Sequence, residues 1–146
     1  IDLASSQIFN CHTAVLPYAR GMYAIENMAA RQDNEQFKQA AGFTIHYIDA
    51  GVDTGAIIQA HRVENPFQFE SIWSLKAYIY LWEFEQFCKF AQDYLNTERT
   101  IPVGVKVSKD ALGENFRIRD FSSAMIVRAE SGYLNMKHLY DSVANW

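Results

Sequence analysis

The chain has 146 residues, of which 49% are hydrophobic and 21% are charged. This balance is typical of a folded protein and excludes a disordered chain, and the length accommodates one domain but not a second large one. Thirteen Lys and Arg residues against seventeen Asp and Glu residues give a net charge of −4, with no basic block. We therefore expect no nucleic-acid partner bound through its phosphates.

Cysteine use and hydropathy indicate a cytoplasmic protein without a metal. The two cysteines, Cys11 and Cys88, are far apart in the sequence and build neither a disulfide framework nor a thiolate zinc site. No two histidines have the spacing of metal ligands with a third ligand nearby. No apolar run reaches the roughly 18 residues that span a bilayer, and the first residues do not resemble a signal peptide, so we expect no membrane partner.

The first forty residues predict a strand, a loop and a helix. Residues 7–12 are typical of a short buried strand, which Pro17 ends by opening a loop that runs to Gly21. Residues 22–31 have apolar side chains spaced for one buried helical face. The polar stretch over residues 31–39 is expected to be a solvated helix end or a loop.

Two neighbouring strands are expected next. Residues 43–48 alternate between apolar and polar side chains, and residues 57–63 alternate less cleanly. Residues 49–55 join them as a loop with glycines near both ends. The strands and helices together predict an α/β fold, a mixed sheet with flanking helices.

The second half is dominated by a long aromatic-rich helix over residues 71–95, which carries two apolar stripes. The simplest interpretation is a core helix, and its many aromatic side chains also allow a subunit interface. Short strands are expected over residues 102–107 and 116–121 around a turn at Gly113, and residues 124–140 have mixed helical and loop character.

Polar side chains gather where the first strand ends. Asn10 and His12 are two residues apart, so they point to the same face of a strand. An asparagine amide can donate to an oxyanion and an imidazole can exchange a proton near neutral pH, which are two requirements of acyl transfer. Asp53, in the glycine-flanked loop, is a candidate for orienting the imidazole. The alternative is that Asn10 and His12 satisfy strand-end hydrogen bonds and that Asp53 forms a turn.

The other three histidines have different interpretations. His46 lies on the second strand, where it either supports Asp53 or is a hydrogen-bonded core residue. We favour the core role unless its side chain faces the same pocket as His12. His61 and His138 are expected to be surface residues.

Two ordered blocks resemble the formyltransferases that use 10-formyltetrahydrofolate. The first block covers residues 10–21, and the second comprises residues 42–49 and 51–58. The resemblance implies a partial formyltransferase-type, Rossmann-like sheet and a catalytic triad of Asn10, His12 and Asp53. It further implies that substrate or cosubstrate is bound by Arg20, Gly21, His46, Thr54 and Gly55.

The resemblance also implies a reaction. An acceptor amine attacks the formyl carbon of 10-formyltetrahydrofolate, Asn10 and a protonated His12 stabilise the oxyanion, and Asp53, whose carboxylate favours the charged imidazole, supports proton transfer. No metal is required. Water in place of the amine would make the protein a formyltetrahydrofolate hydrolase, and the residues do not separate the two. Thr13 and Ala14 stand where the family usually has Pro and Ser, which changes the local turn.

The acceptor and the extent of the chain follow from the same comparison. The Leu16-Pro17 and Arg20-Gly21 pairs resemble members that act on amino sugar nucleotides or on methionyl-tRNA, and the short non-basic tail favours a small amine acceptor. We expect residues 1–146 to be a single catalytic domain that lacks the upstream nucleotide-binding-like half of the family. The edge left open would be filled by that half or by a second copy of the chain. A non-catalytic assembly module is the rival interpretation.

Overall fold

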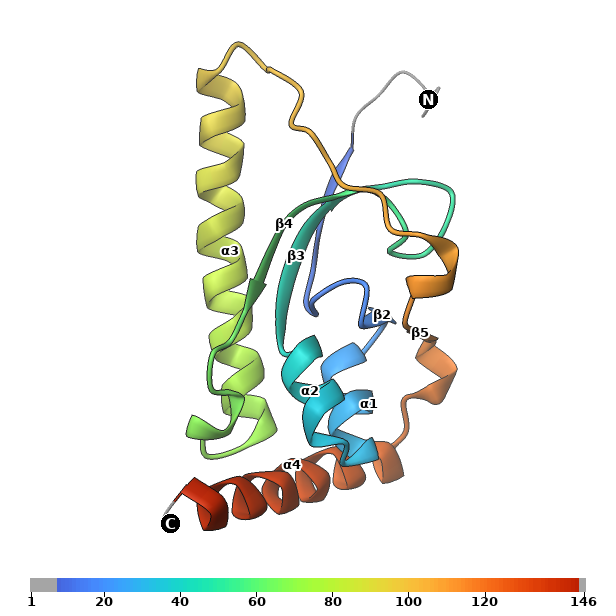
Figure 1. Ribbon diagram of the computed structural model, residues 1–146, viewed down its shortest axis with the longest axis vertical. Helices are drawn as coiled ribbons and strands as arrows, with labels where there is room; N and C mark the ends of the chain where they lie inside the picture. Colours follow the sequence, from blue (N-terminus) through green and yellow to red (C-terminus); the bar gives the residue numbers. More distant parts are fainter. Residues whose placement is uncertain (1–7, 145–146) are drawn as a thin grey trace.

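A three-stranded antiparallel sheet forms the centre of the protein, seen in a computed structural model that describes residues 8–144 (Figure 1). Its strands are β1 (Phe9–His12), β3 (Gly42–Tyr47) and β4 (Ile57–Arg62), in the order β1-β3-β4. The middle strand β3 is buried along all but its last residue. The two expected strands after residue 40 are thus confirmed as neighbours, and β1 pairs with β3 alone among the strands described.

A second, smaller sheet joins distant parts of the chain. β2 (Ala19–Gly21) pairs in parallel with β5 (Glu114–Phe116). The expectation of a loop up to Gly21 is therefore wrong, because a strand nearly a hundred residues later satisfies this backbone.

Two expected strands in the second half are wrong. Past Phe116 the chain turns into the 3-10 helix η3 (Ile118–Asp120). Residues 102–107 form no strand, only an antiparallel bridge between Val105 and Ile57.

Residues 8–144 contain four α-helices: α1 (Ala24–Arg31), α2 (Asn34–Ala40), α3 (Ile72–Asn96) and α4 (Ser123–Ala144). The stretch expected to be a helix end or loop is the complete helix α2, which Asp33 caps through the N–H groups of Glu35 and Gln36. The region of expected mixed character is the single helix α4. In Figure 1, α4 runs beneath α1 and α2, while α3 stands beside β4.

The long helix α3 covers the sheet with one stripe only. Ile72, Leu75 and Ile79 are fully buried, whereas Leu81 and Phe84 are 75% and 71% exposed. The sequence predicted two apolar stripes without distinguishing them, because periodicity marks apolar faces but not which of two faces meets the core. The aromatic-rich helix itself is confirmed. None of the helices over residues 8–144 has the length and hydropathy to cross a membrane.

Candidate active site

Strand pairing places three of the polar side chains on one face. Asn10 lies opposite His46 in the β1–β3 register, and His12 lies opposite Thr44. Opposite residues in an antiparallel pair project to the same side of the sheet, and so do residues two apart on one strand. Asn10, His12 and His46 therefore share a face, as the spacing of the first two predicted.

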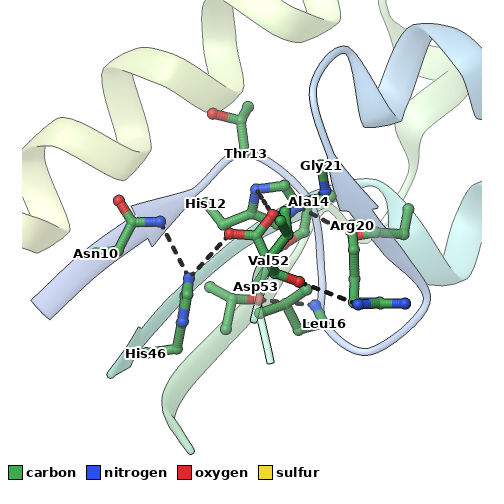
Figure 2. Close-up of polar contacts among 12 residues, drawn as sticks. Asn10, His12, Thr13, Ala14, Leu16, Arg20, Gly21, His46, Val52 and Asp53 are labelled. Atoms are coloured by element: carbon green, nitrogen blue, oxygen red, sulfur yellow. Dashed lines mark hydrogen bonds and ion pairs between the residues drawn. The ribbon is translucent and has the colours of Figure 1, made fainter. Parts of the chain in front are cut away.

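Asp53 enters this face from the loop between β3 and β4, with its carboxylate between the two imidazoles (Figure 2). Its Oδ2 lies 3.5 Å from His12 Nδ1, and its Oδ1 lies 3.5 Å from His46 Nε2. The Gly21 N–H donates to Oδ2 at 2.8 Å. Asp53 holds a left-handed backbone with φ of 50°, an energetically unfavourable conformation for a non-glycine residue that these contacts offset.

Arg20 fixes the loop that carries Asp53. Its Nε donates to the carbonyl of Gly113 at 2.9 Å, and its Nη1 donates to the carbonyl of Val52 at 3.0 Å. We predicted a substrate-binding role for Arg20, and the structure directs this guanidinium to two backbone carbonyls. Its visible contribution is to position Asp53 through the preceding residue.

Gly21 can have no side chain here. Its φ is +83°, and a Cβ would lie 2.0 Å from the carbonyl oxygen of Phe116 on the paired strand β5. Glycine is the residue that accepts both the positive φ and the close approach. It thereby lets one N–H reach Asp53 while the strand pairing stays intact.

Thr54 and Gly55 follow Asp53 in the loop, and no hydrogen bond joins the Thr54 side chain to the triad in the described part of the chain. The Thr54 hydroxyl donates to Asp49 Oδ1 at 2.5 Å, and the Gly51 N–H donates to the same oxygen at 3.0 Å. A Cβ on Gly55 would lie 1.6 Å from the Tyr47 carbonyl oxygen. Both residues shape the loop, and both line a cavity of ≈ 640 Å³.

His46 belongs to the site and is not a separate core histidine. Its Nδ1–H donates to the Tyr47 carbonyl at 2.8 Å, which leaves Nε2 to accept from Asn10 Nδ2 at 3.1 Å. This second bond fixes the Asn10 amide with Nδ2 turned into the site. One N–H of that amide is used, and the other is available to a ligand.

His12 is held as a neutral base beside an ionised carboxylate. Its Nε2–H donates to the Ala19 carbonyl at 3.0 Å, so Nδ1 presents a lone pair toward Asp53. Burial lowers the pKa of His12 below its ordinary value of 6.5, although the Asp53 charge acts in the opposite direction. The carboxylate does favour the charged imidazole, as expected, but desolvation outweighs this ion pair in the resting site.

The pKa of Asp53 is lowered below its ordinary value. Burial alone would raise this pKa, but the contacts of the carboxylate with His46 and His12 and the Gly21 N–H together lower it. At neutral pH the site therefore holds a carboxylate next to a neutral imidazole. That pairing is suited to accepting a proton at His12 Nδ1.

The lowered pKa of His12 predicts acid-sensitive stability. Below pH 6.5 the unfolded chain binds a proton at this histidine that the folded chain does not, so the free energy of unfolding falls as the pH falls. Urea unfolding at pH 7 and at pH 5 checks this. From pH 7 to pH 5 the free energy of unfolding should fall less in His12→Gln than in the wild type. The exposed His138→Gln serves as the control and should behave like the wild type. An equal loss in His12→Gln would contradict the shift.

Glu83 is the neighbour that the sequence analysis missed. It extends from α3, its side chain is buried, and its Oε2 accepts from the Thr13 hydroxyl at 2.7 Å. Burial and Glu83 raise the pKa of Cys11, so this thiol stays protonated. Two features of the sequence could have indicated this contact. One is a glutamate within an apolar helix, and the other is Thr13 at a position where the family usually has Pro. Only the fold brings the two together.

Two small cavities open at the site. One of ≈ 190 Å³ is lined by Asn10, His46 and Asp53 among others, and one of ≈ 290 Å³ is lined by His12, Thr13 and Gly21 among others. Space therefore reaches the two imidazoles from two directions. Within residues 8–144 no group of three His, Cys, Asp or Glu side chains is placed to hold a metal ion.

Comparison with known proteins supports the resemblance to formyltransferases. A family model described as formyl transferase matches residues 1–66. This matched part of the chain contains Asn10, His12 and Asp53, and the match confirms the resemblance drawn from the motifs. A curated relative, the trifunctional purine biosynthetic protein adenosine-3 of Chironomus tentans, is 32% identical over 83 residues, covering 57% of this chain and 6% of the relative.

Solved structures share the fold. The formyltransferase PseJ from Anoxybacillus kamchatkensis, in complex with UDP-4,6-dideoxy-4-formamido-L-AltNAc and tetrahydrofolate, has a TM-score of 0.60 at 18% identity over 86% of this chain and 65% of its own. An N-formyltransferase from Helicobacter canadensis, in complex with folinic acid and dTDP-3-aminofucose, has a TM-score of 0.63 at 19% identity over 84% and 45%. A sugar N-formyltransferase from Shewanella has a TM-score of 0.64 at 17% identity over 90% and 53%.

These likenesses confirm the α/β formyltransferase fold expected from the motifs. The chain spans between 45% and 65% of the length of the three solved structures and a small part of the curated relative.

Proposed function

We propose that this chain is the catalytic part of an enzyme that transfers the formyl group of 10-formyltetrahydrofolate to the amine of a small acceptor, with an amino sugar nucleotide as the first class to test. Asn10, His12 and Asp53 are its triad. The observation that carries the proposal is the Asp53 carboxylate lying 3.5 Å from the His12 imidazole, on the face where Asn10 offers a free N–H.

The geometry supports one order of proton movement. As the acceptor nitrogen bonds to the formyl carbon, its proton passes to His12 Nδ1, and the imidazolium that forms is stabilised by Asp53. The second N–H of Asn10 stabilises the oxyanion. Cleavage of the bond between the formyl carbon and N10 then returns the proton from His12 to the folate nitrogen.

His46 is a positioning residue in this scheme. It holds the Asn10 amide at 3.1 Å and flanks Asp53 on the side opposite to His12. Arg20 and Gly21, which belong to β2, hold the loop that carries Asp53 through hydrogen bonds to Val52 and Asp53. The structure around the triad is thus fixed before any ligand binds, as electrostatic stabilisation of a transition state requires.

The choice of a small acceptor rests on the chain and on its relatives. The net charge is −4 and no basic block is present. Two of the solved structures hold a sugar nucleotide together with a folate. The curated relative is a purine biosynthetic protein, so a phosphorylated amine of that class is the second acceptor to test. We place the reaction in one-carbon metabolism because the proposed donor is a folate, and in the cytoplasm because both cysteines are free thiols.

A product assay tests the proposal. The 146-residue chain is incubated with 10-formyltetrahydrofolate alone, with an amino sugar nucleotide and with a phosphorylated amine, and formylated amine and formate are quantified by mass spectrometry. We expect formylated amine and acceptor-dependent release of tetrahydrofolate. Formate released equally with and without amine would identify a hydrolase. Absence of turnover together with a stable oligomer would favour the assembly module, or a dependence on the upstream half of the family.

A further inference from the structure

Glu83 is a buried acidic residue near the site that the proposed proton path does not use. It lies on α3 and is only 9% exposed. None of the ion pairs in the described part of the chain includes it. A carboxylate that is buried without a cation is costly unless its contacts compensate for the lost hydration. The contacts of Glu83 therefore indicate why a charge is kept there.

Glu83 holds the turn that follows β1. Its Oε2 accepts from the Thr13 hydroxyl at 2.7 Å. A second tie comes from β3, where the Thr44 hydroxyl donates to the Ala14 carbonyl and accepts from the Leu16 N–H, both at 2.9 Å. The turn after β1 is thus fixed to the sheet by one side chain and to α3 by another.

Glu83 reaches this part of the chain from the side opposite to Asp53. In Figure 2 the Thr13 side chain points away from the Asp53 carboxylate. Cys11, which alternates with His12 along β1, is also near Glu83, because burial and then the charge of this carboxylate raise the pKa of the thiol. His12 is therefore bracketed by two carboxylates, one beside its Nδ1 and one behind the strand.

We propose that Glu83 is a positioning residue of the transfer reaction, which fixes the end of β1 through Thr13 and stabilises with its charge the imidazolium that His12 becomes. The inference rests on the proposed function. Transfer of the proton from the acceptor nitrogen to Nδ1 turns a neutral ring into a cation, which Asp53 pairs directly. A second negative charge in the same buried surroundings stabilises that cation further.

Thr13 makes this arrangement particular to the chain. The family usually has a proline at this position, and proline has no hydroxyl to donate. With proline at position 13, a buried carboxylate at position 83 would lose its 2.7 Å donor. Thr13 and Glu83 therefore act as a pair.

His12 faces titratable groups from several elements, and Glu83 is one of the charges that act on it. Burial lowers the pKa of His12 most, Asp53 and Glu83 raise it through their charges, and His46 lowers it. The cavity that His12 lines also contains other titratable residues, namely Cys11, Tyr23, Glu26, Lys76 and Tyr80. Among these, the two charged side chains form an ion pair and offset each other. Loss of the charge at position 83 should therefore lower the pKa of His12.

An NMR titration of the histidine imidazoles tests this effect without relying on turnover. The His12 signals are followed against pH in the wild type and in Glu83→Gln, which keeps an oxygen for the Thr13 hydroxyl and removes only the charge. The matched control is Glu85→Gln, which removes an exposed carboxylate two residues further along α3. We expect the pKa of His12 to fall by about half a pH unit or more in Glu83→Gln and to stay at its wild-type value in the control.

Steady-state kinetics of the whole 146-residue chain test the role in transfer. In Glu83→Gln, kcat should fall about three- to tenfold, the acid limb of the pH profile of kcat/KM should move to lower pH, and the KM for the donor should stay unchanged. Thr13→Val removes the hydroxyl and keeps the charge, so it should lower kcat without moving the acid limb. Thr13→Ser, which keeps the hydroxyl, should restore most of the wild-type rate.

Two results would overturn the proposal: an unchanged pKa of His12 in Glu83→Gln, or wild-type kcat in both Glu83→Gln and Thr13→Val. The product assay separates this failure from that of the proposed function. A chain that transfers formyl groups, with the same pKa of His12 in Glu83→Gln as in the wild type, keeps its function and loses only the role of Glu83.

Discussion

Replacement of His12 by glutamine is expected to reduce kcat for formyl transfer by about a thousandfold, the range of a general base. Glutamine retains an N–H for the Ala19 carbonyl but has no group that takes a proton at the position of Nδ1. Fold and donor affinity should stay close to those of the wild type, because His12 is surrounded by contacts that do not depend on its basicity. Steady-state kinetics measures kcat and the KM for the donor, and circular dichroism checks the fold.

The matched control is His138→Gln, which makes the same change on the exposed surface of α4. We expect wild-type turnover in the control. If His12→Gln retained more than about a tenth of the wild-type kcat, His12 would not be the general base of the reaction.

Replacement of Lys76 by methionine is expected to lower the free energy of unfolding by about 3–5 kcal/mol. Lys76 pairs with Glu26, whose side chain is 2% exposed, and its ammonium also lies over the rings of Tyr23 and Tyr80. Without the lysine, the Glu26 carboxylate is left buried without its cation. Urea unfolding at pH 7 measures the loss.

The control Lys89→Met breaks an exposed pair on the same helix, with Glu85, and should cost about 0.5 kcal/mol or less. The double variant Glu26→Leu/Lys76→Met should recover most of the stability lost in Lys76→Met, because it removes both charges. Similar losses in Lys76→Met and Lys89→Met would show that the buried pair carries no special weight. Glu26 and Lys76 also line the cavity that His12 lines, so loss of the pair changes the wall of that cavity.

Local patterns predicted the central part of this site. Alternation placed Asn10 and His12 on one face of a strand, and the motif blocks named Asp53. What the sequence did not reveal is the register, which sets Asn10 opposite His46 and makes the second histidine part of the site. Register depends on pairing between segments some 35 residues apart, for which neither strand carries a local signal.

The features that were missed depend on longer separations. β2 is a strand because β5 lies beside it. Arg20 was predicted to bind a ligand, but its guanidinium donates to the carbonyls of Gly113 and Val52. Glu83 meets Thr13 across 70 residues. Residues 102–107 were expected to be a strand yet form one bridge, and Val103 and Val105 are 91% and 69% exposed there.

A double-mutant cycle on formyl transfer tests most directly whether the strand and the loop form one catalytic unit. His12→Gln, Asp53→Asn and the double variant are compared with the wild type by kcat/KM, with Asp93→Asn on the exposed part of α3 as the control. If Asp53 acts through His12, each single variant loses activity and the double variant loses no more than His12→Gln alone. Additive losses, or wild-type activity in Asp53→Asn, would contradict the triad.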